Sequence, residues 1–254
     1  AVSTLRLTAR DYLDSRPVVA ELEAISRAIL IAEETGCSLH IVHVSAGRGV
    51  ALVAAARERG VDVTCETCAH YLVLTEWDME KLGAVAKCAP PLRPKFDLEE
   101  LWDELSAGNV SFVTSDHSPC PPEMKSGDDF FRAWGGISGC QSLFNVMLDE
   151  GFHERGLSSE RIAALVSGNV AERFRLPGKG RVEVGADADL ALVDPGVRFT
   201  LREDDLFYRH KVSPYVGREF RGKVVRTMVR GTTVFRNGEV VSGPVGKFIT
   251  PEIA

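Results

Sequence analysis

His43 and Asp116 are the residues whose types and positions best suit them to chemistry. Each comes near the end of a short apolar run, and an imidazole nitrogen or a carboxylate can bind a metal ion. A carboxylate in such a place can also carry a proton during metal-assisted hydrolysis. Structural roles are the alternative: His40 and His43 could be strand histidines paired with backbone, and Asp116 could cap a helix.

Three further segments carry polar or conformationally special residues. Glu66 and His70 are expected in a loop just past a second apolar run, where a structural role at the mouth of the fold is favoured over a ligand contact. Two prolines stiffen residues 87–93, so backbone groups near Ala89 could bind a planar amide, although a rigid connector would look the same. Gly136 lies in a Gly-Gly pair that could line a ligand or simply turn the chain.

Other catalytic signatures are missing from the sequence. It contains no Gly-x-Gly-x-x-Gly or Walker-type phosphate loop and no Gly-x-Ser-x-Gly elbow. Cys120 follows His117 closely, but nothing orients the two as nucleophile and base. Cys65 and Cys68 form a C-x-x-C pair without the second pair that a zinc ribbon needs, so reduced thiols are expected.

The apolar pattern predicts the elements that would position these residues. Strand, helix and strand alternate along the first half of the chain, which is typical of a parallel α/β sheet or barrel. In that architecture functional residues lie at the carboxyl ends of the strands. Helices are expected at 17–36, 49–60 and 98–106, and strands at 38–44, 61–65 and 110–115.

The second half of the chain has a different texture. A long irregular stretch, 120–139, is rich in Gly and Pro, and loops of that length are usually functional. Two helices are expected after it, and a small β-rich module from Gly178 onward. Asn237-Gly238 between apolar runs predicts a hairpin. The expected helices are 140–154 and 159–174, and the strands are 188–193, 223–229, 232–235 and 239–241.

Composition restricts the class of protein. The 254 residues carry 30 Lys+Arg and 36 Asp+Glu, giving a net charge of −6, and 44% are hydrophobic. These values are ordinary for a globular domain, and the acidic balance argues against a nucleic-acid-binding surface. No apolar stretch approaches the roughly 20 residues of a membrane span, and none resembles a signal peptide.

Several segments resemble the cyclic amidohydrolases, a family that includes allantoinase, dihydroorotase and dihydropyrimidinase/hydantoinase. The segments that carry this resemblance are 43–45 (HVS), 66–72 (ETCAHYL) and 88–93 (CAPPLR). Three more are most similar to the allantoinase branch: 115–125 (SDHSPCPPEMK), 133–139 (AWGGISG) and 208–218 (YRHKVSPYVGR). The resemblance covers nearly the whole chain.

The resemblance implies a TIM barrel with a β-sandwich built from both chain ends. It implies a site with two divalent metals, commonly zinc, with cobalt, manganese or iron as alternatives. By this resemblance His43 matches the metal-binding histidine of the sixth strand, and Asp116 matches the metal-binding aspartate of the eighth, which also acts as catalytic base and acid. Ala89, Gly136 and His117 would then contact a small-molecule substrate, allantoin, which is opened to allantoate.

The sequence also departs from the family pattern. It has no His-x-His, no candidate for the carbamylated lysine of the fourth strand and no fifth-strand histidine. We therefore expect the chain to match the C-terminal part of such an enzyme. Residues 1–177 would supply about strands six to eight of the barrel, and 178–254 part of the sandwich. The carbamylated lysine would lie upstream, and activity would need the missing N-terminal half.

Alternative functions are kept open. Another cyclic amidohydrolase, either a dihydroorotase or a hydantoinase, is the alternative within enzymes, and a non-catalytic truncated scaffold is the alternative outside them. The resemblance also implies a cytoplasmic, purine-catabolic homo-oligomer. Neither a nucleic acid nor a membrane is expected as a partner.

Overall fold

The computed structural model describes residues 6–252, which divide into two compact units. Unit 1 runs up to Leu143 and also includes Leu206–Val216, here called the returning segment. Unit 2 consists of Phe144–Asp205 and the chain from Gly217 onward. Among the described residues, no helix has the length and apolar character needed to cross a bilayer.

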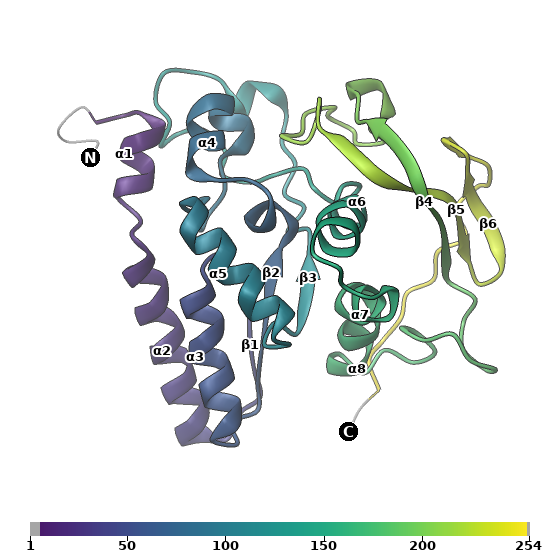
Figure 1. Cartoon of the computed structure of the whole chain (residues 1–254), viewed down its shortest axis with the longest axis horizontal. Helices are drawn as coiled ribbons and strands as arrows, with labels where there is room; N and C mark the ends of the chain where they lie inside the picture. Colours follow the sequence, from purple (N-terminus) through teal and green to yellow (C-terminus); the bar gives the residue numbers. More distant parts are fainter. Residues whose placement is uncertain (1–5, 253–254) are drawn as a thin grey trace. The chain divides into compact units, whose positions relative to one another are not determined.

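Unit 1 combines a parallel three-stranded sheet, in the order β1-β2-β3, with helices packed along it (Figure 1). Its strands are β1 (Leu39–Ile41), β2 (Val63–Cys68) and β3 (Phe112–Thr114). Its α-helices are α1 (Ala9–Asp14), α2 (Val18–Thr35), α3 (Gly47–Glu58), α4 (Glu76–Leu82) and α5 (Lys95–Ser106). Short 3-10 turns are η2 (Ala69–Leu72), η3 (Gly83–Ala86) and η4 (Pro122–Lys125).

Helix α2 ends where its sequence predicts. Ile25, Ile29 and Ala32 recur at helical spacing and are buried, and Gly36 caps the helix in left-handed backbone with φ of 67°. Helices α2, α3 and α5 then pack in succession beside the sheet. Helix α3 approaches its neighbours closely, because a Cβ built on Gly47 would lie 2.6 Å from the backbone of Glu100. Only glycine fits at that contact.

The strands differ from expectation at their ends. β1 and β3 are shorter than the apolar runs that predict them, whereas β2 extends beyond residue 65 to Cys68. Glu66, Thr67 and Cys68 remain in β2 because they pair with Phe112, Val113 and Thr114 of β3. The placement of Glu66 in a loop past the strand was therefore wrong. Helix α4, which sequence reasoning missed, begins at a capping box formed by Thr75 and Asp78.

Unit 2 contains a helical segment and an antiparallel sheet in the order β4-β5-β6-β7. The two expected helices are present: the first becomes π-helical after Val146 and stays so to its end, and the second has a π-helical stretch between two α-helical ones. The Asn237-Gly238 hairpin is confirmed, with both residues at positive φ between β6 and β7. The elements are α6 (Leu143–Val146), η5 (Met147–Glu154), α7 (Ser159–Ala163), η6 (Ala164–Gly168), α8 (Asn169–Arg173), β4 (Leu190–Thr200), η7 (Glu203–Asp205), β5 (Glu219–Val229), β6 (Thr232–Arg236) and β7 (Glu239–Val240).

The compact units are divided elsewhere than at residue 177, the boundary of the domains expected from sequence. The helical segment groups with the sheet because η5 packs against β5. The amide of Arg221 donates to the Asp149 carboxylate at 3.1 Å, and Leu148 lies so close to Gly222 that a Cβ there would meet it at 3.0 Å. Contacts of this kind are invisible to a reading of composition along the chain.

Candidate active site

The three parallel strands of unit 1 each place a chemically capable residue two positions beyond their last residue. β1 ends at Ile41 and is followed by His43, β2 ends at Cys68 and is followed by His70, and β3 ends at Thr114 and is followed by Asp116. Since the carboxyl ends of neighbouring parallel strands meet at one edge of a sheet, these three residues lie at the same edge.

His43 and Asp116 are held in an uncommon backbone conformation. Their φ values are 43° and 39°, in the left-handed region that few residues with side chains adopt. Such conformations carry strain and persist where surrounding contacts fix them, and they concentrate at functional sites. Neither residue lies inside its strand. The structure therefore does not agree with the alternative that His43 is a strand histidine.

His70 is enclosed in the core without a hydrogen-bond partner. Its side chain is 1% exposed, and among the described residues neither Nδ1 nor Nε2 has a partner. Burial, together with the nearby His43, lowers the pKa of His70 to about 3, so the ring is neutral. A buttressing histidine would have both nitrogens satisfied. The orphaned nitrogens indicate instead that a polar group belongs beside this ring.

His40 and Glu66 have the structural role that the sequence left open. His40 Nδ1 lies 2.8 Å from the Thr64 hydroxyl and Nε2 lies 3.1 Å from Glu66, while Thr114 donates to the other Glu66 oxygen at 2.8 Å. The His40 ring also stacks on Phe112 with centroids 4.8 Å apart. This network ties the three strands together just below their carboxyl ends.

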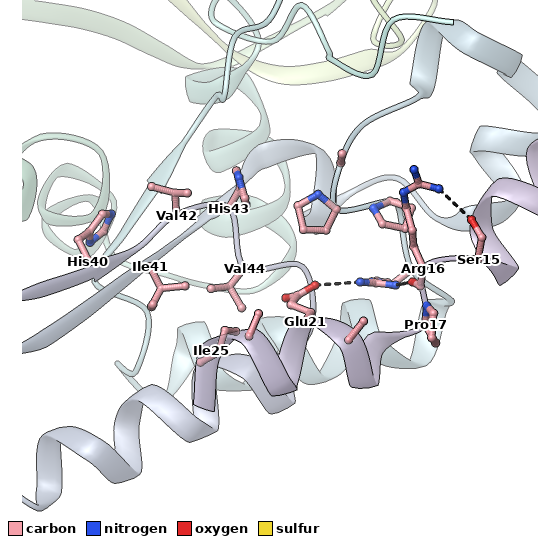
Figure 2. Close-up of a pocket in the computed structure, with 16 residues that line it drawn as sticks. Ser15, Arg16, Pro17, Glu21, Ile25, His40, Ile41, Val42, His43 and Val44 are labelled. Carbon is pink, nitrogen blue, oxygen red and sulfur yellow. Dashed lines mark hydrogen bonds and ion pairs between the residues drawn. The ribbon is translucent and has the colours of Figure 1, made fainter. Parts of the chain in front are cut away.

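A cavity of about 500 Å³ adjoins His43 (Figure 2). It lies along the edge of β1 that no strand of the described chain covers, between that edge and α2. Figure 2 shows Glu21 and Ile25 of α2 facing Ile41 and Val44. Ala89 and the two prolines after it also line the cavity. His43 and Ala89, predicted separately, therefore border one space.

The segment around Ala89 has a fixed backbone, as its prolines predict. The hydroxyl of Tyr12 donates to the carbonyl of Cys88 at 2.9 Å, and that of Tyr71 donates to the carbonyl of Pro90 at 2.7 Å. The peptide bond between Ala89 and Pro90 is cis. Two buried tyrosines thus hold the carbonyls on either side of Ala89, which itself lines the cavity.

The predicted residues Asp116, His117 and Gly136 are brought together by a chain crossing. Residues 117 and 137 form a parallel bridge, in which the amide of Ser118 donates to the carbonyl of Ile137 at 3.0 Å. A Cβ on Gly136 would lie 2.4 Å from the Ser118 hydroxyl, so the chain can pass here only as glycine. His117 Nδ1 accepts the amide of Cys140 at 3.3 Å, which leaves the ring proton on Nε2.

The returning segment completes this corner of unit 1. The ring of Tyr208 packs on His117 with centroids 4.8 Å apart, and its hydroxyl accepts the amide of Gln141 at 2.6 Å. The hydroxyl of Ser213 donates to the carbonyl of Ser138 at 2.7 Å. No spacing in the sequence signals Tyr208 as part of the site. Only its place in the 208–218 segment that carries the family resemblance pointed to it.

Similarity to known proteins shows the family to which this chain belongs. Residues 15–234 match the Amidohydrolase family. The chain belongs to that family. Allantoinase of Rubrobacter xylanophilus is 69% identical over 252 residues, covering 99% of this chain and 56% of the relative. Allantoinase of Deinococcus radiodurans is 55% identical over 242 residues, covering 95% of this chain and 54% of the relative.

Solved amidohydrolase structures share the fold. L-hydantoinase (dihydropyrimidinase) from Arthrobacter aurescens superposes with a TM-score of 0.93 at 37% identity, covering 96% of this chain and 55% of that one. Dihydropyrimidinase from Brevibacillus agri gives a TM-score of 0.90 at 32% identity, covering 95% of this chain and 54% of that one. This amidohydrolase chain thus spans about half the length of the relatives it matches.

Amidohydrolases are in general metal-dependent, so we asked whether the described residues could hold a metal ion. His43 and Asp116 have suitable donor atoms, and the orphaned nitrogens of His70 mark a place for a polar group. Across residues 6–252, however, no three His, Cys, Asp or Glu side chains gather closely enough to hold an ion. A catalytic zinc needs about three protein ligands. The residues that the structure describes therefore do not fit a metal centre by themselves.

Proposed function

We propose that this chain is the C-terminal part of an allantoinase, which hydrolyses the cyclic amide of allantoin to allantoate. The observation that carries the proposal is the common strand-end position of His43, His70 and Asp116, in a chain 69% identical to a relative named allantoinase. Within the barrel these strands would be about the sixth to the eighth.

Asp116 is the proposed proton carrier. Its carboxylate would take a proton from the attacking water and return it to the ring nitrogen that leaves, acting as base and then as acid. Its position just beyond β3, in left-handed backbone, supports this role, because a shuttle works only when the carboxylate stays within reach of both atoms.

The substrate contacts proposed from sequence fit the local geometry. His117, with its proton on Nε2, would donate to a carbonyl of the ureide. Backbone groups at Ala89 and Gly136 would bind the planar amide, since both segments are fixed by contacts that leave no freedom to the chain. Preorganised donors of this kind stabilise developing negative charge better than mobile ones.

The remaining ligands would come from a segment outside this chain. We expect it to bring a His-x-His, a carbamylated lysine and a further histidine, which with His43 and Asp116 would hold two divalent ions, zinc first. The cavity beside β1 supports this, because it borders His43, is lined mostly by apolar atoms and lies along a strand edge that no described strand covers. The whole protein would be cytoplasmic and homo-oligomeric, and it would act in purine catabolism.

Metal content and hydrolysis measured in the same samples test the proposal. The chain alone and the longer protein are assayed against allantoin, hydantoin and dihydroorotate in parallel. We expect about two metals per longer chain, preference for allantoin, and neither metal nor turnover in the chain alone. Preference for hydantoin, which the structural likeness at 37% identity makes the second candidate, would overturn the substrate. A longer protein without metal or turnover would indicate a non-catalytic scaffold.

A further inference from the structure

The turn that carries His43 is held by contacts on the two residues after it. Val44 donates its amide to the carbonyl of Glu66 at 2.8 Å and accepts the Thr67 hydroxyl at 2.8 Å. These bonds fix the turn to β2. They do not fix Ser45, at which the chain leaves the turn and enters α3, and the left-handed φ of His43 needs restraint on both sides.

Glu21 of α2 supplies that second restraint. Its Oε1 accepts the amide of Ser45 at 2.8 Å, and its Oε2 accepts the Ser45 hydroxyl. Ser45 is 1% exposed, so no water competes for these bonds. One carboxylate therefore holds both the backbone and the side chain of Ser45, two residues beyond His43.

Arg93 contacts both members of this pair, Glu21 and Ser45. Its Nε donates to the Ser45 hydroxyl at 2.9 Å, one terminal nitrogen donates to Glu21 at 2.9 Å and the other donates to the carbonyl of Arg16 at 2.6 Å. The side chains of Arg93 and Glu21 are 6% and 9% exposed. The rigid guanidinium fork thus fixes three acceptors from two distant segments at once.

We propose that Glu21 and Arg93 are positioning residues that hold His43 in place through Ser45. The role of His43 rests on the proposed function, whereas the mechanical link does not. Neither Glu21 nor Arg93 is offered as a group that touches the reacting atoms. A buried ion pair contributes little net stability compared with apolar residues of similar size, so stability alone is a poor reason for this one. Setting the conformation of one turn is a sufficient reason.

The backbone at residues 43–45 of the whole chain is the quantity to measure, by NMR. In Arg93→Met we expect the amide of Ser45 to exchange about tenfold faster, because its acceptor loses the charge that orients it. The carbon-13 shifts of His43 should move from left-handed values toward those of extended backbone. Unchanged exchange at Ser45 together with unchanged His43 shifts would overturn the proposal.

A matched variant separates positioning from general stability. Leu105→Ala empties a fully buried site in α5 that has no part in this arrangement. It should lower the stability of unit 1 and leave the His43 shifts as they are. If it moves them as much as Arg93→Met does, the link through Ser45 is refuted.

A second variant covers the case in which Arg93→Met does not fold. Ser45→Ala removes the hydroxyl between the two side chains and leaves their charges paired. It should shift His43 in the same direction, and a wild-type spectrum at His43 would count against the proposal. Since none of these measurements uses turnover, their failure leaves the proposed hydrolysis standing, and failure of hydrolysis leaves them interpretable.

Discussion

His43 and Asp116 each lie two residues beyond the end of a strand, on two strands that are not adjacent, and their φ values are only a few degrees apart at 43° and 39°. In both cases the strand stops pairing, one residue follows, and the chain then turns through left-handed backbone. This conformation costs most residues about 1–2 kcal/mol relative to the right-handed one. The fold carries that cost at two points that face the same edge.

Substitutions at His43 should separate this cost from the chemistry. Asn tolerates left-handed backbone, so we expect His43→Asn to keep stability within about 0.5 kcal/mol, whereas the β-branched His43→Val should lose about 1–2 kcal/mol. Both should abolish hydrolysis by the longer protein. Urea unfolding followed by tryptophan fluorescence measures the stabilities. Equal stability of the two variants would mean that the turn is not strained.

Gly136 and Gly135 form a matched pair for testing the close approach to Ser118. Gly136→Ala should destabilise unit 1 by about 1–3 kcal/mol, because its Cβ would lie 2.7 Å from the Ser118 carbonyl oxygen. Gly135→Ala should be nearly neutral, since the nearest atom to its Cβ is 3.8 Å away. Thermal unfolding of both variants checks the difference, and a neutral Gly136→Ala would contradict it.

Lys87 should make stability depend on pH above neutrality. Burial, with the charges of Arg16 and Lys125, lowers its pKa to about 8 despite Asp129. Above pH 8 the folded chain has released a proton that the unfolded chain keeps up to its ordinary pKa near 10.5, so stability rises with pH in that window.

The comparison with Lys87→Met isolates this contribution. The stability of the wild type minus that of the variant, from urea unfolding at pH 7.5, 8.5 and 9.5, should increase with pH. Other titrating groups, including the buried thiols, are common to both chains and cancel. If the difference stays flat or falls, the pKa of Lys87 is not lowered by folding. Its ammonium would then be stabilised by more than its hydrogen bonds to the Phe131 and Ala133 carbonyls.

The hairpin of unit 2 offers an independent check on backbone arguments. Gly238 has φ of 94°, which residues with a Cβ rarely adopt, so Gly238→Ala should cost about 1 kcal/mol or more. Gly246 has an ordinary φ and open space around it, and its replacement by Ala should be neutral. Equal effects in differential scanning calorimetry would argue against a strained turn at Asn237-Gly238.

Sequence patterns could predict most elements of unit 1, because apolar periodicity and glycine caps act locally. His43 and Asp116 followed from the ends of apolar runs. His70 was placed in a structural role because β2 was ended at residue 65. The polar residues Glu66 and Thr67 interrupt the apolar pattern, so the last residues of that strand can be recognised only from their pairing with β3. With the strand end at Cys68, the same rule would have found all three residues.

The rest of the site depends on contacts between distant segments. Glu21 and Arg93 are 72 residues apart, and each alone looks like an ordinary surface charge. Likewise, Tyr208 packs on His117, although the whole of β4 lies between the two residues in the sequence. Periodicity carries no information about such pairs. The capping box of α4, by contrast, is local: Thr75 and Asp78 are three residues apart, so the helix that sequence reasoning missed could have been predicted without any tertiary contact.

The returning segment has a consequence for the order in which the protein is made. Residues 206–216 belong to unit 1 but emerge from the ribosome only after β4 of unit 2. At about 5–20 residues per second, several seconds pass between the completion of residue 143 and the arrival of Tyr208. During that interval the nascent chain holds His117 and Gln141 without the ring and hydroxyl that later cover them. Unit 1 is therefore begun before unit 2 but completed after most of it. A ribosome that stalls between residues 144 and 205 leaves unit 1 without its returning segment.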